Sequence, residues 1–530
     1  MSLQPVLIDG NWERSENSVD TFQAVNPAEK RDLPEIYPVS SADDVERAVA
    51  AGKEAADQLR STSPEQIADF LTKFAENIEA RAKELVKIAN LETALAKEPR
   101  LASVELPRTT NQLRQAASAA RDRSWCHAII DSHTNIRSKF GPLGGAVAVF
   151  GPNNFPFAFN SCAGGDFAAA AAAGNPVIAK ANTSHPGTTK IFAQAAFDAS
   201  QATGLPKAMV QLIYRLKPAD GFKLVSHPLI GATGFTGSKY AGVKLKEAAD
   251  KAGKPIYLEM SSVNPVFVLP GALRERPSEI AEELYASCSL GAGQFCTNPG
   301  LAVVQAGEDG ESFLGKVSEH FSANTPQTLL GRNGPRDIRA GIEMLTKKGA
   351  EIVTGGQEAD GPGYAFQNTL LRVSGDAFLA DPEALQTEAF GTVTLLVFAR
   401  DTEQMKAIAG GVEGNLTGGF YTHTQGDDDD IYEQVAPVLR EKVGRLLNDK
   451  MPTGVAVVPS MNHGGPYPAT GHPGFTAVGI PAAMMRFCAL HCYDEVRHHR
   501  LPAEIQDKNP TRNMWRLIDG SWTQKDVERE

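Results

Sequence analysis

The sequence predicts an α/β protein built on a doubly wound parallel sheet. From Gly141 onward, short apolar runs alternate with stretches of helical character, which is typical of a parallel sheet covered by helices. The 530 residues exceed the size at which a single core stops growing, about 250–300 residues, so two or more domains are expected. A hydrophobic content of 42% excludes disorder or a fibrous repeat as a description of the whole chain.

Before Gly141, start signals predict long helices. Ser63 is followed by Pro64 and, three residues on, by Gln66, which together form a capping box with proline in the first turn. The other elements expected here are short extended pieces within residues 5–35, a helix at 42–59 capped by Ser40 or Ser41, a helix at about 100–122, and extended residues at 126–140.

After Gly141, five short apolar runs predict the strands of the parallel sheet. They are short, as strands buried on both faces are, and most are followed by a helical stretch. The expected strands are 147–150, 177–179, 210–213, 230–235 and 256–259, with helices at 163–173, 188–203 and 238–252. Residues 265–455 repeat the alternation less regularly, with apolar runs at 266–269, 301–304 and 393–398.

Charge and cysteine content exclude several functions. The 52 Lys and Arg against 63 Asp and Glu give a net charge of −11, which argues against a nucleic-acid partner. Six cysteines without a CxxC pair or metal-ligand spacing predict a reduced, cytoplasmic location and no metal site. The longest apolar run, Phe167–Ala173, is far shorter than the ~20 residues of a membrane span, and no signal peptide is visible, so no membrane association is expected.

Several local patterns are candidate sites, although each is weak alone. Residues 235–238 lie between a strand and a helix, where backbone N–H groups can meet a phosphate. Cys296 follows a flexible glycine segment, but a lone cysteine is more often an inert hydrophobe. Glu259 ends a strand, where carboxylates either line the ligand crevice or cap a turn. Asn154 also follows a strand, with an Asx turn as the alternative interpretation.

Together, six segments resemble the motifs of the aldehyde dehydrogenase superfamily, in the order of that family. The segments are PNNFPF at 152–157, NPVIAK at 175–180, FTGS at 235–238, LEMSSVNP at 258–265, GQFC at 293–296 and EAFGTV at 388–393. The set is far more specific than any one motif, and the sequence is identified as a member of this family. It departs from the usual pattern at Asn153, where relatives have Trp, and at Ser261 and Ser262, where they have a glycine pair.

The resemblance implies an architecture of three parts. A Rossmann-like cofactor domain would comprise residues 1–125 and 141–264, and an α/β catalytic domain residues 265–475. A small β oligomerisation arm with a C-terminal segment would comprise residues 126–140 and 476–530. The resemblance also implies that the chain forms a homodimer or a homotetramer.

The resemblance also implies oxidation of an aldehyde to a carboxylic acid with NAD(P). The Cys296 thiolate would attack the carbonyl and form a thiohemiacetal. The Asn154 amide and the Cys296 N–H would stabilise its oxyanion, and Glu259 would activate the water that hydrolyses the thioester. The cofactor residues implied are Lys180, Thr183, Phe235, Gly237, Ser238, Glu388 and Phe390.

Thr183 predicts that NADP is preferred, with NAD as the alternative cofactor. Many relatives place Glu at this position, three residues after the strand lysine, and that carboxylate would repel a 2′-phosphate. Thr183 is neutral, Lys180 supplies a nearby positive charge, and Arg215 or Lys217 adds another.

The helix at 108–114 and the segments 462–468 and 516–520 resemble the branch of 2-oxoglutarate semialdehyde (2,5-dioxopentanoate) dehydrogenases. An acid-terminated substrate needs a cationic clamp, for which Arg is best suited, so Arg108 and then Arg114 are the candidates. Solvated or ion-paired arginines are the alternative.

Three other functions are weighed against this one. A general aliphatic aldehyde dehydrogenase stays open as an alternative. A CoA-acylating enzyme is disfavoured because it needs no water-activating Glu259. A catalytically silent binding protein is disfavoured by the joint presence of Asn154, Glu259 and Cys296.

Overall fold

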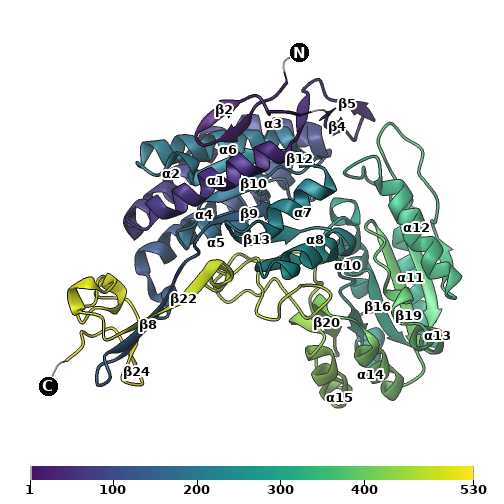
Figure 1. Cartoon of the computed structure of the whole chain (residues 1–530). Helices are drawn as coiled ribbons and strands as arrows, with labels where there is room; N and C mark the ends of the chain where they lie inside the picture. The colour runs from purple at the N-terminus through teal and green to yellow at the C-terminus, as the bar shows by residue number, and fades with distance from the viewer. Residues whose placement is uncertain (1–2, 19, 529–530) are drawn as a thin grey trace.

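Three larger sheets organise the chain in the computed structural model, which describes residues 3–18 and 20–528 (Figure 1). Two are seven-stranded and one is five-stranded. Figure 1 shows the first sheet and its helices in purple and blue, the second in green, and the five-stranded sheet projecting to one side near the C-terminus. No helix in the described part of the chain is long and apolar enough to cross a bilayer.

The first sheet is doubly wound. The chain runs outward from β9 through β10 to β11, then returns to the other side of β9 through β13 and β14, and these five strands are parallel. Antiparallel β1 and β2 extend the sheet beyond β11. The bounds are β1 Val6–Ile8, β2 Asn11–Glu13, β9 Ala146–Phe150, β10 Val177–Lys180, β11 Val210–Ile213, β13 Ile230–Thr236 and β14 Ile256–Glu259. Ligands of such sheets bind outside the carboxyl ends of the strands.

The helix starts predicted at 42 and at Ser63-Pro64 are confirmed. Ser41 and Ser63 each accept a hydrogen bond from the N3 backbone N–H, and the N3 side chains, Asp44 and Gln66, accept the N-cap backbone N–H, so both capping boxes are complete. The Ala-rich α5 is buried along its whole length, because small side chains let it pack closely. The helices are α1 Ala42–Leu59, α2 Pro64–Ala80, α3 Ala82–Thr93, α4 Leu106–Asp122, α5 Gly165–Ala172, α6 Pro186–Ala202, α7 Pro218–Ser226 and α8 Lys239–Lys251.

The single helix expected at about 100–122 is two elements. A π-helical segment, η1 (Lys97–Glu105), precedes α4 and joins it at Leu106. π-helical turns occur often at functional sites, and η1 brings Arg100 and Glu105 to the wall of a cavity described below.

The second sheet is parallel except at one edge. Its order is β17-β18-β19-β16-β15-β20-β21, and only β17 is antiparallel to its neighbour. Alternate residues of its strands face two separate cores: Val303 packs with α12, α14 and α15, whereas Val304 packs with α10 and α11. The strands are β15 Val266–Val268, β16 Leu301–Gln305, β17 Glu351–Thr354, β18 Thr369–Ser374, β19 Val393–Ala399, β20 Asn415–Tyr421 and β21 Val443–Asn448. The helices are α9 Pro270–Glu275, α10 Pro277–Ser289, α11 Glu308–Ala323, α12 Gly334–Lys347, α13 Gly375–Ala380, α14 Thr402–Gly411 and α15 Asp429–Arg440.

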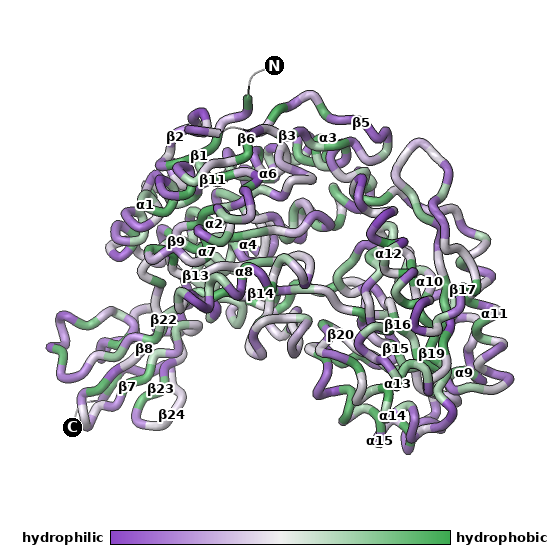
Figure 2. The backbone as a smooth tube through the Cα atoms, turned by 45° about the vertical axis from the view of Figure 1, so that its right-hand side comes forward, coloured by the Kyte–Doolittle hydropathy of each residue, from purple (hydrophilic) through white to green (hydrophobic). Residues whose placement is uncertain are grey.

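The third sheet combines an early and a late part of the chain. Its order is β22-β8-β7-β23-β24, and β22 pairs with β8 over its full length. Residues 482–487 just before β22 still pack in the core of the first sheet. Figure 2 shows this sheet standing apart from the two larger ones. The strands are β7 Ile129–Asp131, β8 Ile136–Pro142, β22 Cys488–Asp494, β23 Arg516–Ile518 and β24 Ser521–Thr523.

Candidate active site

The candidate catalytic residues lie at strand ends, or in the adjoining loops, of the two large sheets. Asn154 and Glu259 follow or end β9 and β14, at the carboxyl edge of the first sheet. Cys296 precedes β16, at the amino edge of the second sheet. The Asn154 side-chain Nδ2 donates to the Gln294 carbonyl at 2.9 Å, so the loop after β9 contacts the loop that carries Cys296. The structure therefore brings together three residues that lie far apart in the sequence.

A trio of side chains lies at the centre of this contact. His463 Nε2 is 3.4 Å from Cys296 Sγ and 2.9 Å from Glu259 Oε1. The side chains of His463 and Glu259 are each 1% exposed. The backbone N–H of His463 donates to Thr476 Oγ1, which holds the segment after β21 in place.

No motif in the sequence predicts a role for His463. Its segment, residues 462–468, indicated only the branch of the family. The contact between Cys296 and His463 joins residues 167 positions apart, and no periodicity or local motif reports such a distance. The motif match was the one signal in the sequence that pointed to this segment at all.

Unpartnered polar atoms at the site are available for chemistry. Glu259 Oε2 is buried and has no hydrogen-bond partner within the described residues. In the same part of the chain, the Cys296 backbone N–H meets no acceptor. Asn264 Nδ2 donates to the carbonyls of Cys296 and Asn298, both at 2.9 Å, and so fixes the cysteine turn. A fixed turn with a free N–H suits an oxyanion.

Burial and a neighbouring carboxylate favour the protonated form of the Cys296 thiol. Burial, the most important cause, and the adjacent Glu259 raise the pKa of Cys296 well above its usual range, while Arg108 acts in the opposite direction. Because the thiolate is the nucleophile, the site needs a group that takes the thiol proton.

Arg108 lies in the wall of a large cavity beside the trio. The cavity of about 1070 Å³ is lined by Arg108, Phe155 and Phe295 among others. The Arg108 Nε and Nη2 atoms are buried without a hydrogen-bond partner within the described residues. Its guanidinium lies 5.3 Å from the Phe159 ring centroid and 5.6 Å from that of Phe155. A ligand with a carboxylate end could accept hydrogen bonds from these unpartnered nitrogens of the buried guanidinium.

The second arginine of that wall is already neutralised. Arg100 Nη1 pairs with Glu105 Oε2 at 2.7 Å, and Arg100 Nη2 donates to the Asn154 carbonyl at 2.9 Å. The other oxygen of Glu105 accepts the backbone N–H groups of Phe157 and Ala158. Arg108 therefore carries the positive charge that stays available to a ligand.

Arg114 does not join the site. It makes a bidentate pair with Glu79, at 2.7 and 2.9 Å, and its side chain is 43% exposed. Arg108 and Arg114 are six residues apart on one helix, about 240° around the axis, so they cannot share a face. Of the two predicted arginines, the structure brings only Arg108 to the cavity.

A second cavity contains part of the predicted cofactor set. Asn153, Thr183, Arg215 and Phe390 line a space of about 710 Å³. Lys180 ends β10 nearby, and burial and then Arg215 lower its pKa to about 8. No carboxylate within the described residues forms an ion pair with Lys180, whose ammonium lies 5.9 Å from the Phe150 ring. The cationic side chains of Lys180 and Arg215 suit the phosphates and ribose of a dinucleotide.

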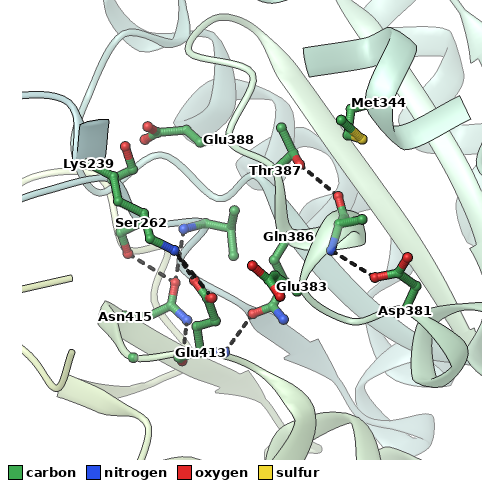
Figure 3. A pocket seen from close by; sticks show the side chains of 14 residues that line it. Lys239, Ser262, Met344, Asp381, Glu383, Gln386, Thr387, Glu388, Glu413 and Asn415 are labelled. Carbon is green, nitrogen blue, oxygen red and sulfur yellow. Dashed lines mark hydrogen bonds and ion pairs between the residues drawn. The ribbon is translucent and has the colours of Figure 1, made fainter. Parts of the chain in front are cut away.

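A third cavity, of about 500 Å³, lies between Lys239 and Glu388 (Figure 3). Lys239 pairs with Glu413 at 3.0 Å on one wall. Burial raises the pKa of Glu388 to about 7, and hydrogen bonds from the Ser261 side chain and the Ser262 backbone oppose this rise. The serines that replace the usual glycine pair are thus part of the scaffold of the site.

The turn at 235–238 lies beside Glu259. The Gly237 N–H donates to the Glu259 carbonyl at 3.1 Å, so this N–H is not free for a phosphate. A Cβ on Gly237 would come within 2.8 Å of the Phe235 ring. Ser238 is the N-cap of α8 and accepts from Ala241 N. Of the first-turn N–H groups of α8, those of Lys239 and Tyr240 meet no acceptor in the described part of the chain and remain for an anion.

The three side chains of the trio form one compact group, because potential donor and acceptor atoms of Glu259, Cys296 and His463 all lie within 4.8 Å of one another.

Comparison with known proteins establishes the family. A profile of the aldehyde dehydrogenase family matches residues 12–440. Alpha-ketoglutaric semialdehyde dehydrogenase 2 of Azospirillum brasilense is 38% identical over 516 residues, which cover 95% of this chain and 96% of the relative. The chain belongs to the aldehyde dehydrogenase family. The alpha-ketoglutaric semialdehyde dehydrogenase of Acinetobacter baylyi is 33% identical over 527 residues, 97% of this chain and 98% of the relative.

Solved structures of aldehyde dehydrogenases share the fold. Aldehyde dehydrogenase C of Pseudomonas syringae, in complex with NAD⁺ and octanal, superposes with a TM-score of 0.79 at 22% identity, covering 93% of this chain and 96% of that one. Lactaldehyde dehydrogenase of Escherichia coli gives 0.77 at 21% identity, covering 93% and 98%. The predicted family and fold class are confirmed. As an NAD(P)-dependent aldehyde dehydrogenase, the enzyme oxidises an aldehyde to a carboxylic acid.

Proposed function

We propose that this aldehyde dehydrogenase oxidises 2-oxoglutarate semialdehyde (2,5-dioxopentanoate) with NADP, using Cys296, Glu259 and Asn154. The observation that carries the proposal is the position of the unpaired Arg108 guanidinium in a cavity beside the Cys296–Glu259 pair. Two relatives that match nearly the whole chain carry the name alpha-ketoglutaric semialdehyde dehydrogenase.

The catalytic roles follow from the free atoms at the site. The Cys296 thiolate attacks the aldehyde carbon and forms a thiohemiacetal. Its oxyanion accepts from the unpartnered Cys296 N–H and the Asn154 amide, whose Nδ2 has a second hydrogen beyond the one given to Gln294. One such donor is worth ~2.7–4 kcal/mol of barrier.

Hydrolysis then falls to Glu259. NAD(P)⁺, when bound, supplies the hydride acceptor that converts the thiohemiacetal into a thioester. Glu259 Oε2, which is buried and unpartnered, takes a proton from the attacking water. General-base catalysis of this kind contributes ~10²–10⁴-fold. The Cys296 thiolate leaves, and the carboxylic acid is released.

The cofactor roles rest on the second and third cavities. Lys180 would hold ribose hydroxyls, and Glu388 with Phe390 would position the nicotinamide ribose and ring. Phe235, Gly237 and Ser238 shape the turn that precedes α8, and the first-turn N–H groups of α8 would meet the pyrophosphate.

The preference for NADP rests on charge. Thr183 and Arg215 line one cavity with Lys180 nearby, so a 2′-phosphate would meet two cations and a neutral hydroxyl. Three acids also line this cavity: Glu92 accepts the N–H groups at the start of α6, Asp32 pairs with Arg332, and Asp337 pairs with Arg336. We expect kcat/KM for NADP to exceed that for NAD, and a tenfold advantage of NAD would contradict this preference.

The substrate proposal is tested by comparing acid and neutral aldehydes. The acid semialdehyde should be favoured over pentanal by ~10²-fold in kcat/KM, because a charge-assisted pair contributes about 1.5–3 kcal/mol. Arg108→Gln should remove most of this difference, whereas Arg114→Gln should keep it, because Arg114 pairs with Glu79 on the surface. Equal efficiency of the wild type on both aldehydes would favour a general aldehyde dehydrogenase.

The catalytic assignment has its own test. Cys296→Ala should abolish oxidation. Glu259→Gln should still give a burst of reduced cofactor followed by slow turnover, because the base acts after hydride transfer. Mass spectrometry of the trapped enzyme should find the acyl group on Cys296, and its presence on another cysteine would overturn the assignment.

A further inference from the structure

The structure raises the question of which group takes the proton of Cys296. The thiol is partly buried, and charged or titratable groups approach it from several elements. These groups are Glu259 at the end of β14, His463 after β21, Arg108 on α4, Glu388 before β19 and, at longer range, Arg445 on β21. Glu259 and Glu388 disfavour the thiolate, and the two arginines favour it.

Two of these groups, Glu259 and His463, can accept the proton, and the position of one nitrogen favours His463. His463 Nε2 contacts both Cys296 Sγ, at 3.4 Å, and Glu259 Oε1, at 2.9 Å. While the imidazole carries its only hydrogen on Nδ1, the lone pairs of Nε2 and of the ionised Oε1 face each other, which is unfavourable. Transfer of the thiol proton to Nε2 gives an imidazolium and turns the same contact into a charge-assisted hydrogen bond.

We propose that His463 accepts the thiol proton of Cys296 and, as an imidazolium held by Glu259, keeps Cys296 as a thiolate. The S–H bond breaks and the Nε2–H bond forms on an imidazole whose own hydrogen is on Nδ1, so the step needs no further reactant. The inference rests on the proposed role of Cys296 as nucleophile. It extends that function by assigning the activation of the nucleophile to a residue with no role in the motif-based mechanism.

The proposal divides the work of Glu259 between its two oxygens. Oε1 holds the imidazolium, whereas Oε2 is unpartnered and free to take a proton from water. The imidazolium is within reach of the sulfur when the thioester is cleaved, so it also stabilises the departing thiolate. Since His463 and Glu259 are buried, solvent weakens this ion pair little.

The test is the pH profile of alkylation of Cys296 by iodoacetamide, with the labelled peptide identified by mass spectrometry. In the wild type, the rate should already be near its plateau at about pH 7, because the thiol is ionised by His463. In His463→Gln, the rate at that pH should fall at least ~10-fold and recover towards about pH 10, as an unassisted thiol ionises. A purely structural role of His463 would not produce such a shift along the pH axis.

A matched control lies nine residues away. His472 is exposed and its ring packs on Tyr257, so His472→Gln should keep the wild-type profile. If His463→Gln also keeps the wild-type profile while Cys296 is the labelled residue, the inference fails and the proposed function stands. If the substrate-protected label lies on another cysteine, the proposed function fails.

A second measurement covers the case in which His463→Gln does not fold. The ultraviolet thiolate absorbance of the wild type is compared with that of Cys296→Ser across the pH range. A difference signal at about pH 7 supports the thiolate–imidazolium pair. The absence of any difference below about pH 8.5, the value of an ordinary thiol, would overturn it.

Discussion

At the residue scale, the trio of Cys296, His463 and Glu259 shows which members of a site the sequence can predict. Glu259 and Cys296 were predicted because each lies in a motif at a strand end or turn. His463 was not, because its function depends on a contact across 167 positions. The sequence favours Arg108 over Arg114, and the structure separates them further, because Arg114 pairs with Glu79 whereas Arg108 lines the cavity.

A carboxylate at position 183 should reverse the cofactor preference. Thr183→Glu places a negative charge in the cavity lined by Arg215, where a 2′-phosphate would be repelled. We expect kcat/KM for NADP to fall ~10–100-fold, equivalent to ~1.4–2.7 kcal/mol, with that for NAD retained. Thr183→Gln, of similar size but neutral, is the control and should keep NADP activity. A fall for both cofactors in both variants would indicate a loss of shape rather than a charge effect.

At the element scale, local sequence signals predict helix starts well, whereas contacts between distant parts of the chain leave no such signal. The capping boxes at Ser41 and Ser63 are local, so the sequence predicts the second cap to the residue and narrows the first to Ser40 or Ser41. A run of four acids such as 427–430 is typical of solvated surface, yet Asp428 is 1% exposed. It accepts the N–H groups of Gly271 and Ala272 in the first turn of α9, and that contact across 157 positions is invisible in the sequence.

Asp428 should therefore matter for stability. Asp428→Ala leaves the N–H groups of Gly271, Ala272 and His423 without their acceptor, which should lower the free energy of unfolding by ~1–3 kcal/mol. Asp427→Ala, at the exposed neighbour, should change it by less than about 0.5 kcal/mol. Urea unfolding followed by fluorescence measures both. Equal stability of the two variants would show that the hydrogen bonds of Asp428 contribute little.

At the scale of the whole molecule, the active site exists only where the two large sheets meet. The strand alternation predicted both sheets, and the carboxyl-end rule placed Asn154 and Glu259 correctly on the first. The part of the site that comes from the second sheet could not be predicted, because it depends on how the loops before β16 and β19 pack against the first sheet. The third sheet was expected from the family resemblance, and its large exposed side chains, among them Leu490 and Trp522, make it the surface through which we propose assembly.

The assembly should be a homodimer or homotetramer held in part by this sheet. Leu490 on β22 is 61% exposed, more than expected for a large apolar side chain without a partner. Leu490→Asp should shift the mass measured by light scattering towards the single chain, because it would bury a charge in the interface. Met344→Asp, an exposed apolar residue on α12, is the control and should leave the mass unchanged. A wild type that elutes as a single chain would contradict the proposal.

The two edges of the third sheet differ in a way that limits growth. The outer edge of β22 is seven residues long, whereas that of β24 at the other end has three. A long edge can pair with a strand from another molecule, and a very short one offers too few hydrogen bonds to do so. A sheet with one usable edge joins a partner once and is then closed, as in a two-fold pair, instead of adding copies end to end. Removing the final hairpin, β23 and β24, would expose β7, whose edge is also three residues long, so the assembly should stay finite.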